Sequence, residues 1–229
     1  MRESWFFIDL PRTPYGEALK LQRRLVDARR TARLARDIVL LTEHDPVFTL
    51  GRHSAAEGYC TGKSPAMREG IPVVAVERGG NITYHGPGQL VVYPIVALHA
   101  RRLDVRTYVS LLEETMIRTA LHWNIPAERN NVNPGVWIGA RKLGSVGIAL
   151  RRGIAFHGFA LNVSCTPEPF NWISPCGLKG IAMTSIAQEA RAPVTVDEAR
   201  IVVHHHLADI FSVELCPADM PAIAGMGTF

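Results

Sequence analysis

Short apolar segments that predict β-strands alternate along the chain with longer segments that predict α-helices, and this alternation is the strongest constraint on the fold. The expected strands are residues 5–10, 38–42, 71–76, 89–95, 136–138, 142–150 and 154–163. The expected helices are residues 15–36, 104–122 and 195–210. Strands interleaved with three long helices favour an α/β (α+β) fold. Because no repeat or composition break marks a linker, we expect a single domain over residues 1–229.

Local signals set the boundaries of several of these elements. Asp104 is a good N-cap for the second helix, and Thr195-Val196-Asp197-Glu198 is a capping box at the start of the third. The turn residues Arg151-Arg152-Gly153 predict a hairpin between the last two strands. Glycines and a proline recur through residues 51–70, so that stretch is expected to be mostly loop.

The composition excludes several classes of protein. With 47% hydrophobic and 20% charged residues, the chain can form a substantial core, and its net charge of +4 does not demand a nucleic-acid partner. The apolar run before Asp9 is too short for a signal peptide. The longest apolar candidate, residues 90–98, falls well short of the roughly 20 residues that a spanning helix needs. We therefore expect a cytoplasmic protein with no membrane partner.

The cysteines and histidines give no pattern typical of a metal site. Cys60, Cys165, Cys176 and Cys216 are far apart with no C-x-x-C pair, so in the cytoplasm we expect reduced thiols, without a disulfide or zinc. Consecutive histidines at residues 204–206 diverge around a helix and make a poor metal site. No metal is expected.

A glycine-rich segment, residues 78–90, is the first candidate for a ligand site. It reads Arg78-Gly79-Gly80-Asn81-Ile82-Thr83-Tyr84-His85-Gly86-Pro87-Gly88-Gln89-Leu90 and is expected to be a loop between two strands. Glycine has no Cβ, so backbone N–H groups in such a segment can approach a ligand closely. Arg78 could bind a carboxylate or phosphate, or could bridge loop carbonyls instead.

Cys176 is the candidate nucleophile, because it stands in a rigid Pro175-Cys176-Gly177 turn. A free cysteine has a pKa of about 8.5, so an effective nucleophile needs a neighbouring cation or base. The alternative is an inert buried thiol, which is the usual fate of a free cysteine. For the other three cysteines we expect that inert role. A cysteine nucleophile with a glycine-rich cradle suggests an acyl-transfer enzyme.

Lys142 is the candidate cation, at the start of the apolar strand 142–150. Strand alternation places Lys142 on one face with Gly144, Val146 and Ile148, so that Gly144 leaves space beside the amine. A lysine in a partly apolar cleft can have its pKa lowered enough to relay protons. The alternative is an ordinary strand-end lysine that reaches solvent.

Histidines and a basic helix complete the candidates. His85 and His157 each precede a glycine, and each is either a general base or a structural polar group. Most charged residues of the first helix are cations, and they form either a solvated face or a docking surface for an acidic protein. These cations are Lys20, Arg23, Arg24, Arg29, Arg30, Arg33 and Arg36, against Glu17 and Asp27.

An ordered set of motifs resembles the lipoyl(octanoyl) transferases within the biotin and lipoate ligase superfamily. The resemblance begins with the segment 78–90 and extends in order over residues of about 38 to 190. Its further motifs are Gly135-Val136-Trp137, Lys142 to Gly147, His157-Gly158-Phe159-Ala160-Leu161-Asn162, Pro175-Cys176-Gly177 and Thr184-Ser185.

The resemblance implies a fold, a reaction and a set of site residues. The fold would be a mixed central sheet with surrounding helices, as in the biotin and lipoate ligase catalytic domain. Octanoyl-acyl carrier protein would donate an octanoyl group to a lysine of a lipoyl domain in 2-oxoacid dehydrogenase complexes or in the glycine cleavage H protein. Cys176 would carry the acyl thioester with Lys142 as its partner, and no cofactor would be needed. The substrate would be bound by Arg78, Gly79, Gly80, Asn81, Ile82, Thr83, Tyr84, His85, Ser145, Val146, Gly147, Gly158, Phe159 and Ala160.

Two other functions are compatible with parts of this pattern. An ATP-dependent lipoate or biotin ligase would share the fold but would have no use for a cysteine nucleophile. A non-enzymatic acyl-carrier-binding or nucleic-acid-binding module could use the basic first helix, and it would tolerate the loss of the Cys176 thiol.

Overall fold

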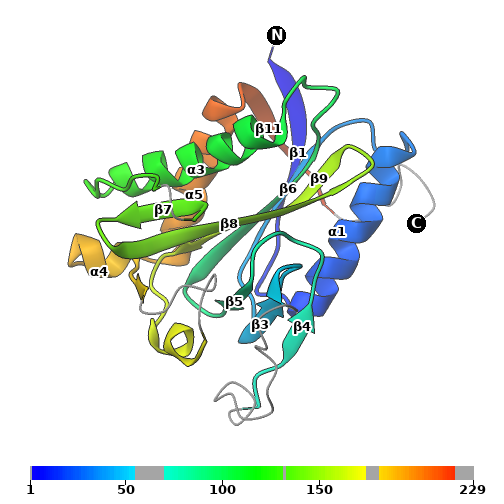
Figure 1. The fold of residues 1–229 in the computed structure, drawn as a ribbon. Coiled ribbons are helices and arrows are strands. Elements are labelled where there is room, and N and C mark those ends of the chain that lie inside the picture. The colour runs from blue at the N-terminus through cyan, green and yellow to red at the C-terminus, as the bar shows by residue number, and fades with distance from the viewer. Residues whose placement is uncertain (1, 55–69, 131–132, 174–180, 220–229) are drawn as a thin grey trace.

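A mixed β-sheet forms the centre of the computed structural model, which describes residues 2–54, 70–130, 133–173 and 181–219 (Figure 1). The strand order is β10-β8-β9-β6-β2-β1-β11, with β7 paired to β8. β1 runs parallel to β2 and β11, whereas the pairs β2–β6, β6–β9 and β8–β9 are antiparallel. The strands are β1 (Glu3–Asp9), β2 (Ile38–Thr42), β6 (Gln89–Ala97), β7 (Gly135–Ile138), β8 (Arg141–Arg151), β9 (Ile154–Asn162), β10 (Ala182–Met183) and β11 (Val213–Pro217).

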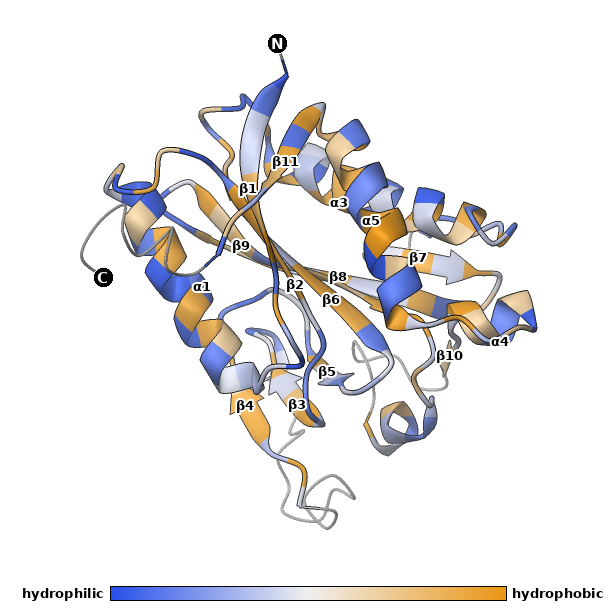
Figure 2. Cartoon of the chain, turned by 180° about the vertical axis from the view of Figure 1, so that it is seen from behind, coloured by the Kyte–Doolittle hydropathy of each residue, from blue (hydrophilic) through white to orange (hydrophobic). Residues whose placement is uncertain are grey.

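Helices cover both faces of this sheet, which gives three layers (Figures 1 and 2). α1 (Tyr15–Arg30) packs on one face, where its apolar side meets β2, β6 and β9. α3 (Val105–Leu121) and α5 (Val196–Ile210) pack on the other face and against each other. The short α4 (Ile186–Ala190) follows the edge strand β10, and the 3₁₀ helix η2 (Glu168–Trp172) packs against β5 (Ile82–His85).

The central strands are apolar without interruption because both of their faces are covered. Every residue of β2, β6 and β9 is buried, and Figure 2 shows these strands as predominantly hydrophobic. Burial on two faces removes the need for a polar side, which explains why their sequences lack the alternation of a half-exposed strand. The expectation of a mixed sheet with surrounding helices is confirmed.

A second, smaller sheet has the order β4-β3-β5 and was only partly expected from the sequence. β4 (Val73–Ala75) is shorter than the strand predicted at 71–76, and β3 (Val47–Leu50) was not predicted. β5 (Ile82–His85) corrects the prediction that residues 78–90 form a loop throughout. Its alternate side chains explain the strand, because Ile82 and Tyr84 pack against Phe48 in a separate apolar cluster.

The first helix ends at Arg30 rather than at residue 36, which is a second correction. Ala32 has a φ of 58°, so the helix cannot continue through it, and the chain reverses to bring Leu34 into the core. Asp37, which follows the reversal in the sequence, holds it in place through two hydrogen bonds. Its carboxylate accepts from Arg29 Nε at 2.7 Å and from the Ala97 backbone N–H at 3.0 Å.

The predicted caps and the hairpin are confirmed. Asp104 accepts from the Thr107 N–H, and the capping box of Thr195 and Glu198 has both of its hydrogen bonds. In the β8–β9 hairpin, Arg152 and Gly153 both have positive φ, as a two-residue turn of this kind requires. The hairpin thereby fixes the register of the two strands that carry much of the site.

Candidate active site

A cavity of about 330 Å³ opens between β8, β9 and the segment of residues 78–85. This volume lies in the range of about 300–1,000 Å³ that is usual for small-molecule sites. The sequence-predicted residues in its wall are Lys142 and the set Arg78, Gly79, Gly80, Asn81, Ile82, Thr83, His85, Ser145, Val146, Gly147, Gly158, Phe159 and Ala160. Segments that are far apart in the sequence therefore meet at one place.

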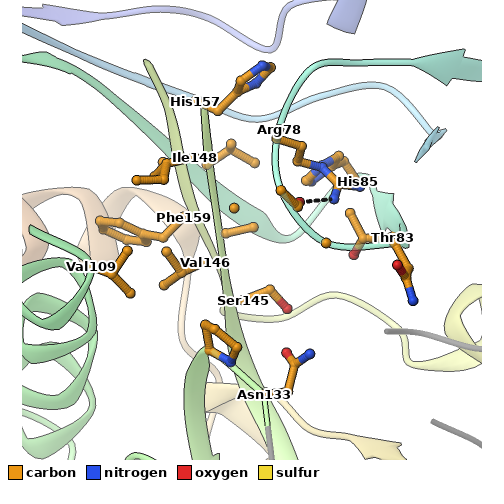
Figure 3. A pocket seen from close by; sticks show the side chains of 18 of the residues that line it. Arg78, Thr83, His85, Val109, Asn133, Ser145, Val146, Ile148, His157 and Phe159 are labelled. Atoms are coloured by element: carbon orange, nitrogen blue, oxygen red, sulfur yellow. Dashed lines mark hydrogen bonds between the residues drawn. The ribbon is translucent and has the colours of Figure 1, made fainter. Parts of the chain in front are cut away.

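One part of the wall is apolar. Val109 of α3, Val146 and Ile148 of β8 and Phe159 of β9 contribute it. Figure 3 shows Val109, Val146 and Phe159 close together, on the other side of the β8 ribbon from Arg78 and His85. A cavity with one apolar part and one polar part suits a ligand that has a hydrocarbon chain and a reactive polar end.

Lys142 is buried in the wall of the cavity, with a residual exposure of 1%. Its Nζ donates to Asn133 Oδ1 and, at 3.1 Å, to the carbonyl oxygen of Pro134. It also lies 5.1 Å from the centre of the Trp137 ring, within the range of a cation–π interaction. The ammonium is therefore held by the protein interior, and the alternative of a strand-end lysine in solvent is wrong.

The predicted face of β8 is wrong at Lys142 because the β7–β8 pairing contains an irregularity. Trp137 pairs with Lys142 while Val136 pairs with Gly144, so β8 carries one extra residue there. Leu143 and Gly144 both face the α3 layer, since Leu143 belongs to its core and a Cβ on Gly144 would lie 2.6 Å from Met116 Sδ. The space beside Gly144 is thus filled by Met116 and is not open to the amine.

Arg78 holds the polar side of the cavity together. Its guanidinium donates to the carbonyl oxygens of Gly79 and Thr49, at 3.0 and 2.7 Å, and to Thr49 Oγ1 at 2.8 Å. The stem packs over Gly147, where a Cβ would lie 3.0 Å from Arg78 Cδ. Arg78 therefore bridges backbone carbonyl oxygens of β3 and of its own segment, and its role in binding a substrate stays a prediction.

The alternation of β5 divides its side chains between the cavity and the small apolar cluster. Thr83 and His85 line the cavity, whereas Tyr84 packs against Phe48 and Phe170 with ring centres 5.3 and 5.4 Å away. The Tyr84 side chain is therefore outside the cavity wall, although it was predicted among the substrate-binding residues. The absence of a side chain at Gly86 leaves room for the Tyr84 hydroxyl group, because a Cβ there would lie 2.2 Å from the Tyr84 oxygen.

His85 is a buried, neutral imidazole. Its Nδ1 lies 2.7 Å from Gln89 Oε1, and its ring stacks on Tyr15 with centres 5.6 Å apart. Burial lowers the pKa of His85 to about 3, and repulsion from His44 acts in the same direction. His44 is similar, since burial lowers its pKa to about 4 while its ring nitrogens face Thr13 O and Tyr93 Oη.

His157 also lines the cavity, and its backbone is unusual for a strand. Its φ of 57° lies in the left-handed region, and its N–H donates to Gln22 Oε1 at 3.0 Å. Its Nε2 lies 3.8 Å from Glu77 Oε2, too far for a hydrogen bond, and Glu77 is itself paired with Arg23. Burial lowers the pKa of His157, while the Glu77 carboxylate acts in the opposite direction. The geometry shows a strained wall residue beside an ion pair.

The candidate nucleophile, Cys176, lies outside the described residues, as does Cys60. The described residues on either side, Ile173 and Ile181, pack against the apolar cluster that contains Ile82 of the cavity wall. Just beyond, Met183 of β10 pairs with Lys142. Cys165 is buried, which raises the pKa of its thiol to about 12, and this supports the expectation that it is inert.

Several residues of the wall were not found from the sequence. Asn133 precedes Pro134 and Gly135, and this turn signal before a predicted strand could have drawn attention to it. Tyr15, Tyr93 and Val109 belong to ordinary helices and strands. Nothing local distinguishes them, because only the tertiary fold brings them to the cavity.

Known proteins place this site in a family. Residues 14–208 match the family model described as the lipoyl protein ligase A/B catalytic domain. The chain belongs to this family. An octanoyltransferase of Desulfotalea psychrophila is 47% identical over 90% of this chain and 93% of its own length, and one of Syntrophobacter fumaroxidans is 42% identical over 99% of each. The resemblance to the lipoyl(octanoyl) transferases that the motifs indicated is therefore confirmed, and these full-length relatives support an acyltransferase that carries out octanoyl transfer in protein lipoylation.

Solved structures of lipoate protein ligases share the fold. A putative lipoate protein ligase of T. acidophilum has a TM-score of 0.75 at 15% identity, covering 97% of this chain and 92% of that one. A lipoate-protein ligase A bound with ATP has a TM-score of 0.74, also at 15% identity, with coverage of 99% and 92%. At this identity the likeness establishes the architecture alone.

The described residues contain neither a membrane-spanning helix nor a cluster of metal-binding side chains. None of the helices there has the length and apolar character needed to cross a membrane. Nor does that part of the chain bring together three or more side chains that could hold a metal ion.

Proposed function

We propose that this enzyme transfers an octanoyl group to a protein lysine through a thioester on Cys176, with Lys142 as the proton-relaying partner. The observation that carries the proposal is the buried Lys142 ammonium in the wall of a cavity that is partly apolar. A buried ammonium is costly unless it is used or well held, so its position at the cavity favours a chemical role. The name octanoyltransferase, which the relatives carry, indicates that an octanoyl chain would fill the apolar part of the cavity.

The proposed reaction has two steps. In the first, the Cys176 thiolate attacks the donor thioester carbonyl, a new C–S bond forms as the donor C–S bond breaks, and the donor thiol leaves with a proton given by the Lys142 ammonium. In the second, the acceptor lysine amine attacks the enzyme thioester, a C–N bond forms as the C–S bond to Cys176 breaks, and the Cys176 thiolate leaves. The attacking nitrogen must lose a proton, and Lys142, now a neutral amine, would receive or relay it and return to the ammonium. Exchange of thioesters is nearly balanced and amide formation is strongly downhill, so no ATP is required.

The proposed donor is octanoyl-acyl carrier protein, and the proposed acceptors are lipoyl domains of 2-oxoacid dehydrogenase complexes and the glycine cleavage H protein. Reliance on a free thiol suits the reducing cytoplasm, where we place the reaction. The basic side of α1 would help to dock these partners. Several of its cations are engaged within the chain, since Arg23 pairs with Glu77, Arg29 with Asp37 and Arg30 with Asp27.

An ATP-dependent ligase is the second candidate, because solved ligases share the fold and one of them was determined with ATP. The sequence relatives favour the transferase. The two activities separate cleanly in the test tube. A transferase works without ATP and stops on thiol alkylation, whereas a ligase needs ATP and tolerates alkylation.

Intact mass spectrometry tests the proposed intermediate. Incubation of the wild type with octanoyl-acyl carrier protein, without acceptor, should add one octanoyl mass. Cys165→Ala should acquire the same mass, because that buried thiol is not the nucleophile. The Cys176→Ala variant should not acquire it. If Cys176→Ala is acylated while Cys165→Ala is not, the assignment is wrong. Full function in Cys176→Ala without any acylation would favour the non-enzymatic module.

A further inference from the structure

One line of hydrogen bonds runs through the buried interior from the backbone of Lys142 to the ring of His85. The Thr184 N–H donates to the Lys142 carbonyl oxygen at 3.0 Å, and Asn162 Nδ2 donates to the Thr184 carbonyl oxygen at 3.0 Å. Gln89 Nε2 then donates to Asn162 Oδ1 at 2.9 Å. Gln89 Oε1 meets His85 Nδ1 at 2.7 Å. All of these side chains are buried.

The Thr184 carbonyl oxygen, at one end of the side-chain part of this line, fixes which group donates and which accepts in each bond that follows. A backbone carbonyl can only accept, so the Asn162 amide must present its NH₂ group to Thr184 and its oxygen to Gln89. Gln89 must therefore turn its NH₂ group to Asn162, and the contact of that group with the Tyr84 carbonyl oxygen at 3.4 Å agrees. The Gln89 oxygen is left for His85 Nδ1, which must carry the hydrogen.

This arrangement determines what His85 offers to the cavity. A neutral imidazole with its hydrogen on Nδ1 has a bare lone pair on Nε2. The small exposed part of His85 is in the cavity wall, so Nε2 is the nitrogen open to a ligand. Such a nitrogen can accept a hydrogen bond, but it has no hydrogen to give to a carbonyl oxygen or an oxyanion. In Figure 3 His85 lies beside Arg78 and Thr83 on the polar side of the cavity.

His85 Nε2 could either accept a hydrogen bond from the substrate or remove a proton from it, and the pKa of His85 decides between these two roles. Burial lowers the pKa of His85 to about 3, far below the value of about 10.4 for a lysine ammonium, so this imidazole is a weak base toward the substrate at neutral pH. Its Nε2 is therefore suited to accept a hydrogen bond and poorly suited to remove a proton. A lysine amine has N–H groups that need acceptors as it sheds its water.

We propose that His85 Nε2 accepts a hydrogen bond from the attacking lysine amine and thereby aims the nitrogen lone pair at the thioester carbonyl. This inference rests on the proposed function and gives a specific role to His85, which the family resemblance placed among the substrate-binding residues without assigning one. The bond-making step is unchanged. The C–N bond forms as the C–S bond breaks, and the proton leaves toward Lys142 while His85 keeps a second N–H in place. Gln89 and Asn162 are positioning residues that fix the tautomer of His85.

Nuclear magnetic resonance of protein labelled with ¹⁵N-histidine tests the tautomer directly in the wild type. The expected result is a hydrogen on Nδ1 and a bare Nε2 for His85 at neutral pH. The signal is assigned by its loss in His85→Gln. A hydrogen on Nε2 would overturn the proposal whatever the kinetics show, and this measurement does not depend on the stability of any variant.

Single-turnover kinetics of the acylated enzyme tests the role. His85→Phe keeps a ring of similar size and should form the acyl-enzyme at nearly the wild-type rate, while the reaction with a lipoyl domain slows by about 10- to 100-fold. His85→Gln offers an acceptor oxygen at a similar reach and should recover much of the loss. His205→Phe, at an exposed position of α5, is the matched control and should behave as wild type.

The results separate this inference from the proposed function. A normal second step in His85→Phe, with the acyl-enzyme formed, would overturn the role of His85 alone. A wild type that forms no acyl-enzyme would overturn the proposed function, and the tautomer measurement would still decide whether His85 offers an acceptor.

Discussion

At the scale of single residues, the cavity is defined by side chains whose polar groups are fixed from behind. Lys142 is held by Asn133 and the Pro134 carbonyl oxygen, and Arg78 is held by the Gly79 and Thr49 carbonyl oxygens. Groups that are oriented before a ligand arrives lose little freedom when it binds. The functional end of each side chain is therefore set in part by residues outside the motifs, namely Asn133, Pro134 and Thr49.

The Lys142 ammonium can be removed without removing its stem. Lys142→Met should fold, because methionine fills a similar apolar path, and octanoyl transfer should fall by at least about 100-fold. An ammonium near Cys176 favours the thiolate, so the pH midpoint of iodoacetamide alkylation at Cys176 should rise in the variant. Lys142→Arg, which cannot release a proton near neutral pH, is expected to keep much of the alkylation behaviour and lose transfer. An unchanged midpoint with wild-type transfer would contradict the role.

At the scale of elements, the end of α1 is set by a buried ion pair more than by helix propensity. Asp37 is 1% exposed and receives both the Arg29 guanidinium and the Ala97 N–H, which ties the helix end to β2 and β6. The pair between Arg30 and Asp27 lies on the same helix but is largely exposed, with an N–O distance of 3.6 Å. The two pairs offer a comparison of the same chemistry in two environments.

Asp37→Asn should lower the free energy of unfolding by about 3 kcal/mol, because it leaves the Arg29 charge partly buried without a carboxylate. Asp27→Asn should cost less than about 1 kcal/mol, since exposed pairs contribute little. Urea titrations of both variants measure these values. Equal losses would show that burial does not set the strength of the helix anchor.

At the scale of the whole molecule, the helices divide the surface of the sheet into two sides, and α1 reaches the cavity through Tyr15. Docking of a protein partner should therefore involve the first turns of α1. At 1.5 Å per residue, Arg30 at the end of α1 lies about 22 Å farther along the helix than Tyr15, whereas Lys20 lies only about 7.5 Å away. Arg23 serves poorly as a probe of docking, because its loss would disturb Glu77 beside His157.

Charge reversal at Lys20 and Arg24, which are exposed on α1, should raise KM for the protein substrates about tenfold and weaken its dependence on salt. Rates with a small acyl thioester and a short lysine peptide should barely change. Arg30→Glu with Arg33→Glu, one reversal at the far end of the helix and one just beyond it, provides the control. Equal loss with small and protein substrates would argue against docking on α1.

Much of the fold and most of the described cavity residues could be predicted from the sequence, and the failures have physical causes. Caps, the hairpin turn and the apolar strands are local signals, so Asp104, Thr195 and β8 were found. The end of α1 depends on Asp37 and Ala97, which are distant in sequence. The side chain of Lys142 was assigned to the wrong face because an extra residue in β8 shifts the alternation. Val109 joins the cavity only through helix packing, which leaves no trace in its own segment.

The two buried imidazoles, His44 and His85, also link folding to proton uptake. Both stay neutral in the folded state down to a pH of about 4 and about 3, whereas in the unfolded chain they bind protons below a pH of about 6.5. Stability is therefore complete above pH 6.5 and is lost as the pH falls, by about 1.4 kcal/mol per pH unit for each group. His157, His204 and His206 shift in the same direction.

Urea midpoints between pH 6.5 and 5.5 measure this uptake while the carboxylates, with ordinary pKa values of about 4, remain almost fully ionised. His44→Gln should reduce the dependence of the free energy of unfolding on pH by the contribution of one histidine. An unchanged dependence would show that His44 is already protonated in the folded state. The chemistry that gives the cavity a bare nitrogen at neutral pH thus makes the folded protein sensitive to acid.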